Sequence, residues 1–592
     1  MQNISKQIMT DPRDVCSLVE LFAKQSDIMG KSPFMWQRLK GEWHTISWLH
    51  SQHTIARMAN SLRMMGVKKG ARVLLLSENR PEWIIANIAI MALGAISVPL
   101  YTTQTPDAYS LLIKDSGARY AFCSNATLYD KLYQALQKSD AYQTFAGLIM
   151  MEPIEESFKK NNAPPLYEWD DCLKTGEMRA TNLMSLCQSL KRDQICSIIY
   201  SSGTTGDPNG VMLTHGSILC NCYGALRVLD HLENTEFGRE VFLSFLPLSH
   251  SYEHFAGQFL PILIGAQIYF CDHLERLIDD ITEVRPTLMS AVPRLYEMLQ
   301  KRIMQGLKTA SPLRRRLFSM TLKLGQKRIE GQPLSLIETI LDILAEKLVR
   351  KKIKAKFGSR LKTFISGGAP LNYENGLFLS SIGLQLLQGY GLTETSPVVS
   401  VNNPKCNRLD TVGRAMEGVE VKCASDGEIL IRGELVMQGY WNKPELTAKT
   451  IRQGWLMSGD IGKIDEDGFI KIIDRKKDII VNSGGENISP QKIEGMLCLN
   501  EAIVAAMVYG DQKAHLSALI VLDKGYQQDD AKIAIEKTNA NLSQVERIRY
   551  FCFADEPFTI ENGELTPSLK IRRHAIKKRY SKRLEALYPK PS

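Results

Sequence analysis

Apolar and polar residues recur with two different periods along the first hundred residues. Apolar side chains recur at helical spacing over residues 47–65, and a short continuous apolar run follows at residues 70–76. Such a run is typical of a buried strand after a turn. Pro81 favours the start of a helix, and residues 95–100 predict a second strand. This order, with near-continuous apolar strands, predicts a parallel sheet covered by helices.

Similar patterns recur later in the chain. Residues 195–199 form another short apolar run, and residues 364–371 predict a strand that ends in a glycine turn, where open parallel sheets bind ligands. Residues 427–433 and 439–442 indicate a strand and a turn in a β-rich part. Residues 483–490 predict a glycine loop before a helix.

The chain is too long for one hydrophobic core. At 592 residues, two to four folding units are expected. The longest apolar stretch, residues 83–100, is interrupted by polar residues, glycine and proline, which favours a buried helix and a strand over a membrane span. The first fourteen residues contain Asp11 and Asp14 and no apolar core, so they do not predict a secretory signal.

Charge and cysteine usage fit a cytoplasmic protein. The balance of 73 basic and 64 acidic residues gives a net charge of +9, which suits an anionic ligand or a membrane surface. Twelve cysteines are scattered without a Cys-x-x-Cys pair, which favours reduced thiols over disulfides or zinc. No recognisable motif indicates nucleic-acid binding.

A basic, helix-rich segment spans residues 301–356. One helical face of it is apolar, formed by Leu336, Ile337, Ile340, Leu344 and Leu348. Two interpretations compete: this face packs on the core of the protein, or it meets anionic lipid at a membrane surface. The second predicts peripheral attachment at the inner face of a membrane.

The loop at residues 200–210, with the sequence YSSGTTGDPNG, alternates glycines with hydroxyl side chains. Backbone N–H groups and hydroxyls could converge there on one phosphate, although the same composition also makes ordinary turns. No Gly-Lys-Ser/Thr closes the loop, which argues against a P-loop nucleoside triphosphatase.

In its order of residues, this loop closely resembles the phosphate loop of the adenylate-forming superfamily. SENRPEW (77–83), GAISVPLYTT (94–103), LPLSHSYEH (246–254) and QGYGLTETSP (388–397) resemble segments of its AMP-forming acyl-CoA synthetases. NGELTPSLKIRR (562–573) matches their terminal signature. The matches follow the family order from about residue 45 to 575. They are most similar to long-chain fatty-acyl-CoA synthetases.

The resemblance implies a set of site residues. The ATP- and AMP-binding residues would be Ser201, Ser202, Gly203, Thr204, Thr205, Gly206, Gly368, Ala369, Pro370, Gly389, Tyr390, Gly391, Thr393, Asp460 and Arg475. Tyr390 would stack on adenine, Thr393 would bind the α-phosphate, and Asp460 would accept both ribose hydroxyls. Glu394 would hold Mg²⁺, which prefers carboxylate and phosphate oxygens.

The resemblance also implies the reaction and the domain plan. His250 would line the carboxylate pocket, and Lys570 would bridge the incoming carboxylate and the phosphate as the catalytic lysine. The fold class is α/β. A large domain (1–473) of parallel and mixed sheets with a β-rich part would join a small mobile α+β domain (479–592) through a hinge (474–478) centred on Lys477. Ser483, Gly484 and Gly485 would line a CoA tunnel after the small domain turns.

The implied function is an AMP-forming long-chain fatty acid–CoA ligase that uses ATP, CoA and Mg²⁺. A medium-chain or aromatic acid, transfer to a carrier protein, and a reaction that stops at acyl-adenylate remain alternatives. A protein that binds acyl ligands or nucleotide without turnover is a further one. One departure bears on it: Asn209 stands where the family usually has a lysine, and asparagine carries no charge. We expect weaker pyrophosphate contact there but not loss of the reaction.

Overall fold

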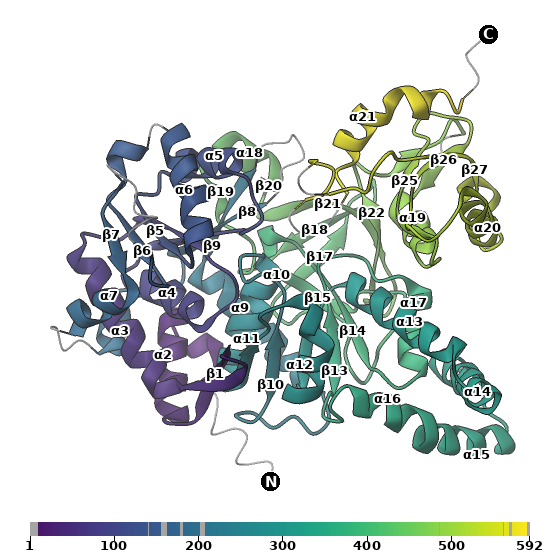
Figure 1. The fold of residues 1–592 in the computed structure, drawn as a ribbon, viewed down its shortest axis with the longest axis horizontal. Helices are drawn as coiled ribbons and strands as arrows, with labels where there is room; N and C mark the ends of the chain where they lie inside the picture. The colour runs from purple at the N-terminus through teal and green to yellow at the C-terminus, as the bar shows by residue number, and fades with distance from the viewer. Residues whose placement is uncertain are drawn as a thin grey trace.

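The computed structural model describes residues 10–139, 141–155, 163–177, 182–201, 208–484, 486–559, 562–566 and 571–588. Figure 1 shows a large body formed by about the first four fifths of the chain and a smaller C-terminal unit beside it. Three helices of the large body extend away from it as an arm.

Two large sheets build the body. The eight-stranded sheet has the order β19 (Gly439–Tyr440), β9 (Asn209–Thr214), β8 (Ile195–Ser201), β4 (Ile96–Leu100), β3 (Arg72–Leu76), β5 (Tyr120–Cys123), β6 (Gly147–Met150) and β7 (Leu166–Glu168). It is parallel from β8 to β7, whereas β9 and β19 are antiparallel to their neighbours. The expected strands at residues 70–76 and 95–100 are thus confirmed as adjacent parallel strands, β3 and β4.

The nine-stranded sheet has the order β16 (Arg414–Ala415), β15 (Val398–Val401), β14 (Leu386–Gly391), β13 (Thr363–Ser366), β12 (Leu288–Ala291), β10 (Val241–Ser244), β11 (Gln267–Phe270), β1 (Pro33–Leu39) and β2 (Glu42–Ser47). Its strands from β14 to β1 are parallel, and both edges are antiparallel. The sheet therefore ends in hairpin-like edges beside a parallel centre.

Helices fill the space between the two sheets and cover their outer faces. These helices are α2 (Leu18–Met29), α3 (Trp48–Met64), α4 (Pro81–Ala92), α5 (Pro106–Ser116), α6 (Ala126–Lys138), α7 (Trp169–Glu177), α8 (Leu183–Cys187), α9 (His215–Leu229), α10 (Ser251–His254), α11 (Leu260–Leu263), α12 (Leu277–Val284) and α17 (Tyr373–Ser381). Along β3, Val73 and Leu75 face one core and Leu74 and Leu76 face another, because successive strand side chains point to opposite faces. Both faces of this strand are buried, which explains its continuous apolar sequence.

A third sheet forms the β-rich part. It contains β17 (Glu420–Cys423), β18 (Glu428–Arg432), β21 (Trp455–Ile464), β20 (Ile451–Arg452) and β22 (Ile470–Arg475). The expected strand at residues 427–433 lies here. The expected turn at residues 439–442 does not, because β19 pairs with β9 of the eight-stranded sheet before the chain enters α18 (Pro444–Thr450).

The C-terminal unit has its own core. Its sheet of β25 (Ile503–Tyr509), β26 (Leu516–Leu522) and β27 (Ile548–Phe553) packs α19 (Pro490–Cys498) and α20 (Gln528–Asn539) on one face and α21 (Arg573–Glu585) on the other. A short hairpin, β23 (Ile480–Val481) and β24 (Asn487–Ile488), precedes α19 as the glycine loop predicts. This matches the expected α+β character of the small domain.

The basic segment forms α13 (Pro293–Lys308), α14 (Pro312–Ile329), α15 (Leu336–Ala345), a π-helical turn (Glu346–Arg350) and α16 (Lys351–Lys356). We call α14, α15 and α16 the helical arm (Figure 1). The apolar face is exposed: Leu336 is 87% exposed, Ile337 72% and Ile340 61%. The interpretation that this face packs on the core is therefore wrong.

Candidate functional site

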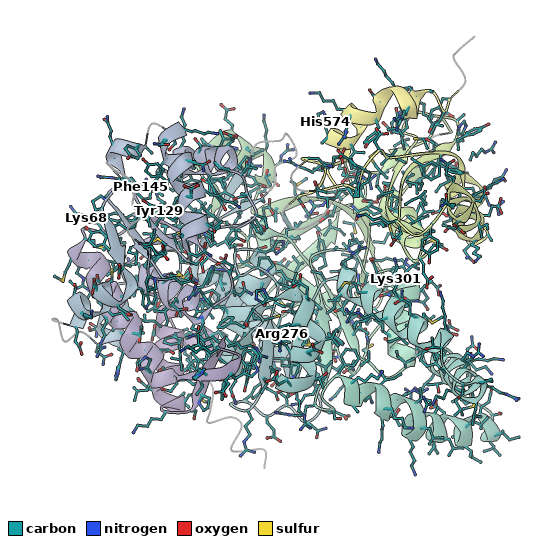
Figure 2. The ribbon with its side chains drawn as sticks, in the orientation of Figure 1. Lys68, Tyr129, Phe145, Arg276, Lys301 and His574 are labelled. Carbon is teal, nitrogen blue, oxygen red and sulfur yellow. The ribbon has the colours of Figure 1, made fainter. Side chains whose placement is uncertain are left out.

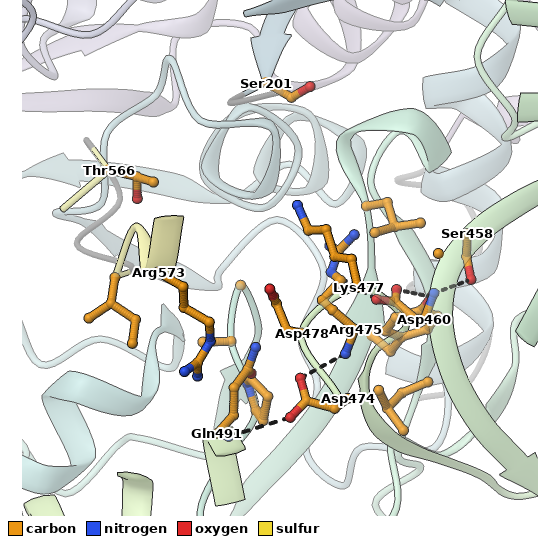
Figure 3. Close-up of a pocket in the computed structure, with 18 of the residues that line it drawn as sticks. Ser201, Ser458, Asp460, Asp474, Arg475, Lys477, Asp478, Gln491, Thr566 and Arg573 are labelled. Carbon is orange, nitrogen blue, oxygen red and sulfur yellow. Dashed lines mark hydrogen bonds and ion pairs between the residues drawn. The ribbon is translucent and has the colours of Figure 1, made fainter. Parts of the chain in front are cut away.

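A cleft of about 2860 Å³ lies between the large domain and the C-terminal unit. Most of the residues that the sequence assigns to nucleotide binding line it. They are Ser201, Gly368, Ala369, Pro370, Gly389, Tyr390, Gly391, Thr393, Asp460 and Arg475. The predicted carboxylate-pocket, metal and hinge residues His250, Glu394 and Lys477 line it too. Figure 3 shows Ser201, the Asp460–Arg475 region and Thr566 and Arg573 of the C-terminal unit around one cavity. The fold thus brings together motifs that are far apart in the sequence.

Asp460 contacts two other predicted site residues in this cleft, Tyr390 and Arg475. Antiparallel pairing of β21 and β22 sets Asp460 opposite Arg475. Arg475 Nε lies 2.8 Å from Asp460 Oδ1, and the hydroxyl of Tyr390 donates to Oδ2 at 2.6 Å. Burial and the charge of Asp460 raise the pKa of Tyr390 well above its usual value, so this hydroxyl remains a donor. Each carboxylate oxygen has a second lone pair and can accept a further hydroxyl.

Thr393 and Glu394 lie in a single 3₁₀ turn that directly follows β14. Tyr440 donates from its hydroxyl to Glu394 Oε1 at 2.9 Å, and Met437 N–H donates to the Glu394 carbonyl. Thr393 Oγ1 lies 3.1 Å from Ser251 Oγ. These contacts hold the turn against two other segments of the chain. They place the carboxylate of Glu394 on the cleft wall.

The donor set at Glu394 suits a hard cation. No group of three or more His, Cys, Asp or Glu side chains arranged for a metal is present in the part of the chain that the structure describes. Mg²⁺ commonly takes one or two carboxylates and completes its shell with phosphate oxygens and water. A single carboxylate on the wall of this cleft therefore fits Mg²⁺ that arrives with a nucleotide.

His250 is the N-cap of α10, and its Nδ1 accepts the Tyr252 N–H at 3.2 Å. The imidazole lies on the cleft wall, near the Tyr101 ring. The next acidic residue, Glu253, is fully buried and accepts from Ser244 and Ser290 at 2.7 Å each. Burial raises the pKa of Glu253 to about 7.

The two limbs of the predicted phosphate loop are held together at its base. Ser201, the last residue of β8, pairs with Asn209, the first residue of β9. Ser201 and Asn209 both line the cleft. The loop residues Ser202, Gly203, Thr204, Thr205 and Gly206 lie outside the described residues.

One residue at this base was not predicted from the sequence. Lys443 Nζ donates to Asn209 Oδ1 at 2.7 Å and to the Pro208 carbonyl at 3.1 Å. Lys443 reaches Asn209 because β19 adds to the edge of β9, a pairing that no local pattern in the sequence indicates.

The C-terminal unit contributes residues before position 567 and after position 570 to the wall of the cleft. Thr566, Ile571 and Arg572 line the cavity, and His574 stands at the end of α21 on the side toward the large domain (Figure 2). Lys570 itself lies outside the described residues. Burial lowers the pKa of Lys477, the expected hinge residue.

The expected CoA-tunnel loop lies apart from this cavity. Ser483 and Gly484 are exposed and do not line the cleft in this arrangement of the two units. Ser483 N–H donates to the Lys513 carbonyl at 3.0 Å, within the C-terminal unit. Gly485 lies outside the described residues.

A large α/β domain, a smaller α+β unit and the cleft between them make up a two-domain α/β fold. The AMP-binding enzyme family matches residues 24–441, and the family's C-terminal domain matches residues 477–592. The chain belongs to this family of adenylate-forming enzymes.

Curated relatives match over nearly the whole chain. The long-chain-fatty-acid–CoA ligase FadD15 of Mycobacterium bovis is 30% identical over 591 residues, which is 94% of each chain. Long chain acyl-CoA synthetase 3 of Arabidopsis thaliana is 30% identical and covers 98% of this chain and 93% of its own.

Solved structures agree in fold. The adenylation domain of a carboxylate reductase from Mycobacterium chelonae matches with a TM-score of 0.79 and 21% identity, covering 99% of this chain and 94% of its own. The anthranilate CoA ligase AuaEII matches with a TM-score of 0.74 and 19% identity, covering 98% of this chain and 100% of its own. Among the described residues, no helix is both long and apolar enough to cross a bilayer.

Proposed function

We propose that the protein is an AMP-forming long-chain fatty acid–CoA ligase. ATP and a fatty acid give acyl-AMP and pyrophosphate, and acyl-AMP and CoA then give acyl-CoA and AMP. The observation that carries this proposal is the match, along 94% of both chains, to a curated long-chain-fatty-acid–CoA ligase. The grouping of Tyr390, Asp460 and Arg475 in one cleft supports the nucleotide part of the reaction.

In the first step the fatty acid carboxylate attacks the α-phosphorus of ATP, and pyrophosphate leaves. Asp460 accepts the ribose hydroxyls, Tyr390 stacks on adenine and Thr393 binds the α-phosphate. Lys570 bridges the two reacting anions, and His250 lines the pocket of the carboxylate. Glu394 would hold Mg²⁺, which would offset charge on the phosphate oxygens. Bringing two anions into line with fixed donors and cations is the main task of such a site.

In the second step the small domain swings about residues 474–478 so that the CoA thiolate reaches the acyl-adenylate. The present arrangement supports the assignment of two states. Residues that flank Lys570 line the cleft, whereas Ser483 and Gly484 do not, so this conformation suits adenylation. Rotation of the small domain would move the residues that flank Lys570 out of the cleft and bring Ser483 and Gly484 to it.

The first experiment is pyrophosphate release by the purified protein with magnesium-ATP, across acids from acetate to oleate, with and without CoA. CoA-dependent turnover that peaks at long chains supports the proposal. A stoichiometric burst that CoA does not change contradicts it and favours an adenylate-forming ligase with another acceptor. No release with any acid contradicts both and favours a binding protein.

The helical arm extends this proposal to a partner, the anionic surface of a membrane. Leu336, Ile337, Ile340 and Ile343 of α15 expose an apolar face, each by more than half, and Leu313 of α14 is 68% exposed. A solvent-exposed apolar patch of this kind indicates a binding partner with an apolar interior, such as a lipid bilayer.

Charge on the arm commits the partner to anionic lipid. The acidic side chains near α15 are already paired: Glu338 with Lys327, Asp342 with Arg350 and Glu346 with Lys354. Exposed basic residues of the same arm are Arg314, Arg315, Arg316, Lys347, Lys351, Lys352 and Lys356. An apolar face rimmed by cations is the arrangement by which amphipathic helices bind the interface of an anionic bilayer.

Co-sedimentation with vesicles tests this partner. The wild type should bind vesicles of phosphatidylglycerol and phosphatidylcholine more than pure phosphatidylcholine. Replacing Leu336, Ile337 and Ile340 with serine, or Arg314, Arg315 and Arg316 with glutamine, should reduce binding severalfold. The matched control replaces the exposed Lys532, Lys578 and Lys582 of the small domain with glutamine. Equal binding by the wild type and both arm variants would contradict the proposal.

A further inference from the structure

The predicted phosphate loop carries no cation of its own. Between Tyr200 and Gly210 the one charged residue is Asp207, which is acidic. The terminal phosphates of ATP are strongly anionic, and neutral donors alone bind such a group less well than charge-assisted ones. To make a charge-assisted contact there, the loop therefore requires a cation from another segment of the chain, in addition to the Mg²⁺ that accompanies ATP.

Lys443 meets this requirement at the base of the loop. Its ammonium lies 2.7 Å from Asn209 Oδ1 and 3.1 Å from the Pro208 carbonyl oxygen. Asn209 lines the cleft, and Lys443 lies behind it, outside the cleft wall. The positive charge is thus one side chain away from the cavity.

This contact fixes which way the Asn209 amide faces. An ammonium group only donates, so it occupies the acceptor oxygen of the amide. The NH₂ of Asn209 is then the end directed away from Lys443, as a donor. A cation on the oxygen polarises the amide and strengthens hydrogen bonds from its nitrogen. Together the two side chains present a donor backed by a full charge.

The backbone around Lys443 is held in place for this contact. Trp441 N–H donates to the Gly210 carbonyl at 2.7 Å, which continues the β19–β9 pairing. Asn442 takes a left-handed conformation with φ of 55°, and its side chain donates to the Asp115 carbonyl at 2.9 Å. The turn directs Lys443 back over the start of β9, so its position follows from the fold and not from a flexible reach.

We propose that Lys443 and Asn209 form a two-residue contact for the β- and γ-phosphates of ATP, in which Lys443 supplies the charge and Asn209 the hydrogen-bond donor. Lys443 is a positioning residue, because it acts through Asn209. This inference rests on the proposed function for its ligand, ATP, but not for the identity of the acid.

Equilibrium binding of magnesium-ATP and of AMP tests the contact without any acid or CoA. Lys443→Met should weaken ATP binding about tenfold and leave AMP binding unchanged, because AMP has no β- or γ-phosphate. Asn209→Asp removes the donor and adds a negative charge, so it should weaken ATP binding at least as much. Lys532→Met, on the exposed surface of α20, is the control for loss of one positive charge.

A second variant separates this role from a structural one. Asn209→Lys in the Lys443→Met background restores a cation at the loop and should recover most of the ATP affinity. Equal ATP affinity in Lys443→Met and Lys532→Met, or equal losses for ATP and AMP, would overturn the inference. Because AMP binding reports an intact nucleotide site, failure of the ligase proposal on fatty acids leaves this comparison readable.

Discussion

At the scale of single residues, the pair of Asp460 and Arg475 combines opposite charges with a fixed geometry in the cleft. The Asp460 side chain is 4% exposed and pairs with Arg475, whose own side chain is 39% exposed. Burial opposes charge on Arg475, but the carboxylates of Asp460 and Glu394 outweigh it and raise its pKa. Arg475 therefore stays charged through the neutral range, and its contact holds the Asp460 carboxylate in place on the cleft wall.

Asp460→Asn should raise the KM for ATP by tenfold to about a hundredfold, because a hydrogen bond to a charged group contributes about 1.5–3 kcal/mol. The KM for the fatty acid should change little. Steady-state kinetics with each substrate varied measures both. Asp465→Asn, in the exposed β21–β22 turn, is the matched control. A larger change for the acid than for ATP would contradict the assignment.

Glu253 makes stability depend on pH. Its pKa is raised by burial to about 7 in the folded protein, above the ordinary value near 4.5, so the folded state holds this proton more tightly. The stabilisation is complete below about pH 4.5 and is lost as pH rises through about 7, on the order of 3 kcal/mol at most.

Glu253→Gln imitates the protonated form and should remove this part of the pH dependence. The difference in melting temperature between variant and wild type should grow in favour of the variant from pH 5 to pH 8. Thermal unfolding across that range measures it, with Glu466→Gln in an exposed turn as the control. A difference that stays constant with pH would contradict the role of Glu253.

At the scale of elements, Gly325 allows α14 of the arm to pack closely against α17 of the body. A Cβ added at Gly325 of α14 would lie 2.4 Å from the Ser381 carbonyl oxygen at the end of α17. Arg350 strengthens the same junction: it is fully buried, and its Nε donates to that carbonyl at 3.0 Å. The arm is thus joined to the body by close backbone packing and a buried hydrogen bond.

Gly325→Ala should destabilise the protein by about 2 kcal/mol, because backbone atoms on α17 must move. The matched control is Gly306→Ala on α13, where nothing lies within 4 Å of the new Cβ and helix propensity predicts a gain of up to about 1 kcal/mol. Thermal unfolding of both variants measures the difference. Equal stability of the two would show that α14 does not need this close approach.

The elements also show how far the sequence carries the prediction. Local patterns predict β3, α4, β4 and β8, because period and proline position act within a few residues. Motif order predicts that Tyr390, Asp460 and Arg475 share a cleft. No local pattern predicts that β19 pairs with β9, so Lys443 was missed. For α15 the apolar face was recognised, but periodicity alone gives no partner for a face, and the structure leaves it exposed.

At the scale of the whole molecule, a surface ion pair links the two domains. Lys308 of α13 lies 2.8 Å from Glu501 of the C-terminal unit, and the Tyr526 hydroxyl also donates to Glu501. Lys301, on the same helix, lies between the C-terminal unit and the arm in Figure 2. An exposed pair contributes roughly 0.2–1 kcal/mol. That is enough to shift an equilibrium between two nearly balanced domain orientations a few-fold.

Lys308→Glu should therefore reduce the share of the present orientation, because two carboxylates then face each other. Lys308→Glu with Glu501→Lys should restore it. Small-angle X-ray scattering or fluorescence transfer between labels on the two domains measures the share. An unchanged distribution in Lys308→Glu would mean that other contacts set the orientation.

The rigid junction at Gly325 and Arg350 has a consequence for how the enzyme meets its acid. If the arm binds lipid as proposed, the large domain keeps a constant orientation to the surface, and the acid reaches it by diffusion in the bilayer while ATP and CoA arrive from water. Rate should then follow the mole fraction of fatty acid in the bilayer. At a constant bulk concentration of acid, adding inert lipid should slow turnover by surface dilution.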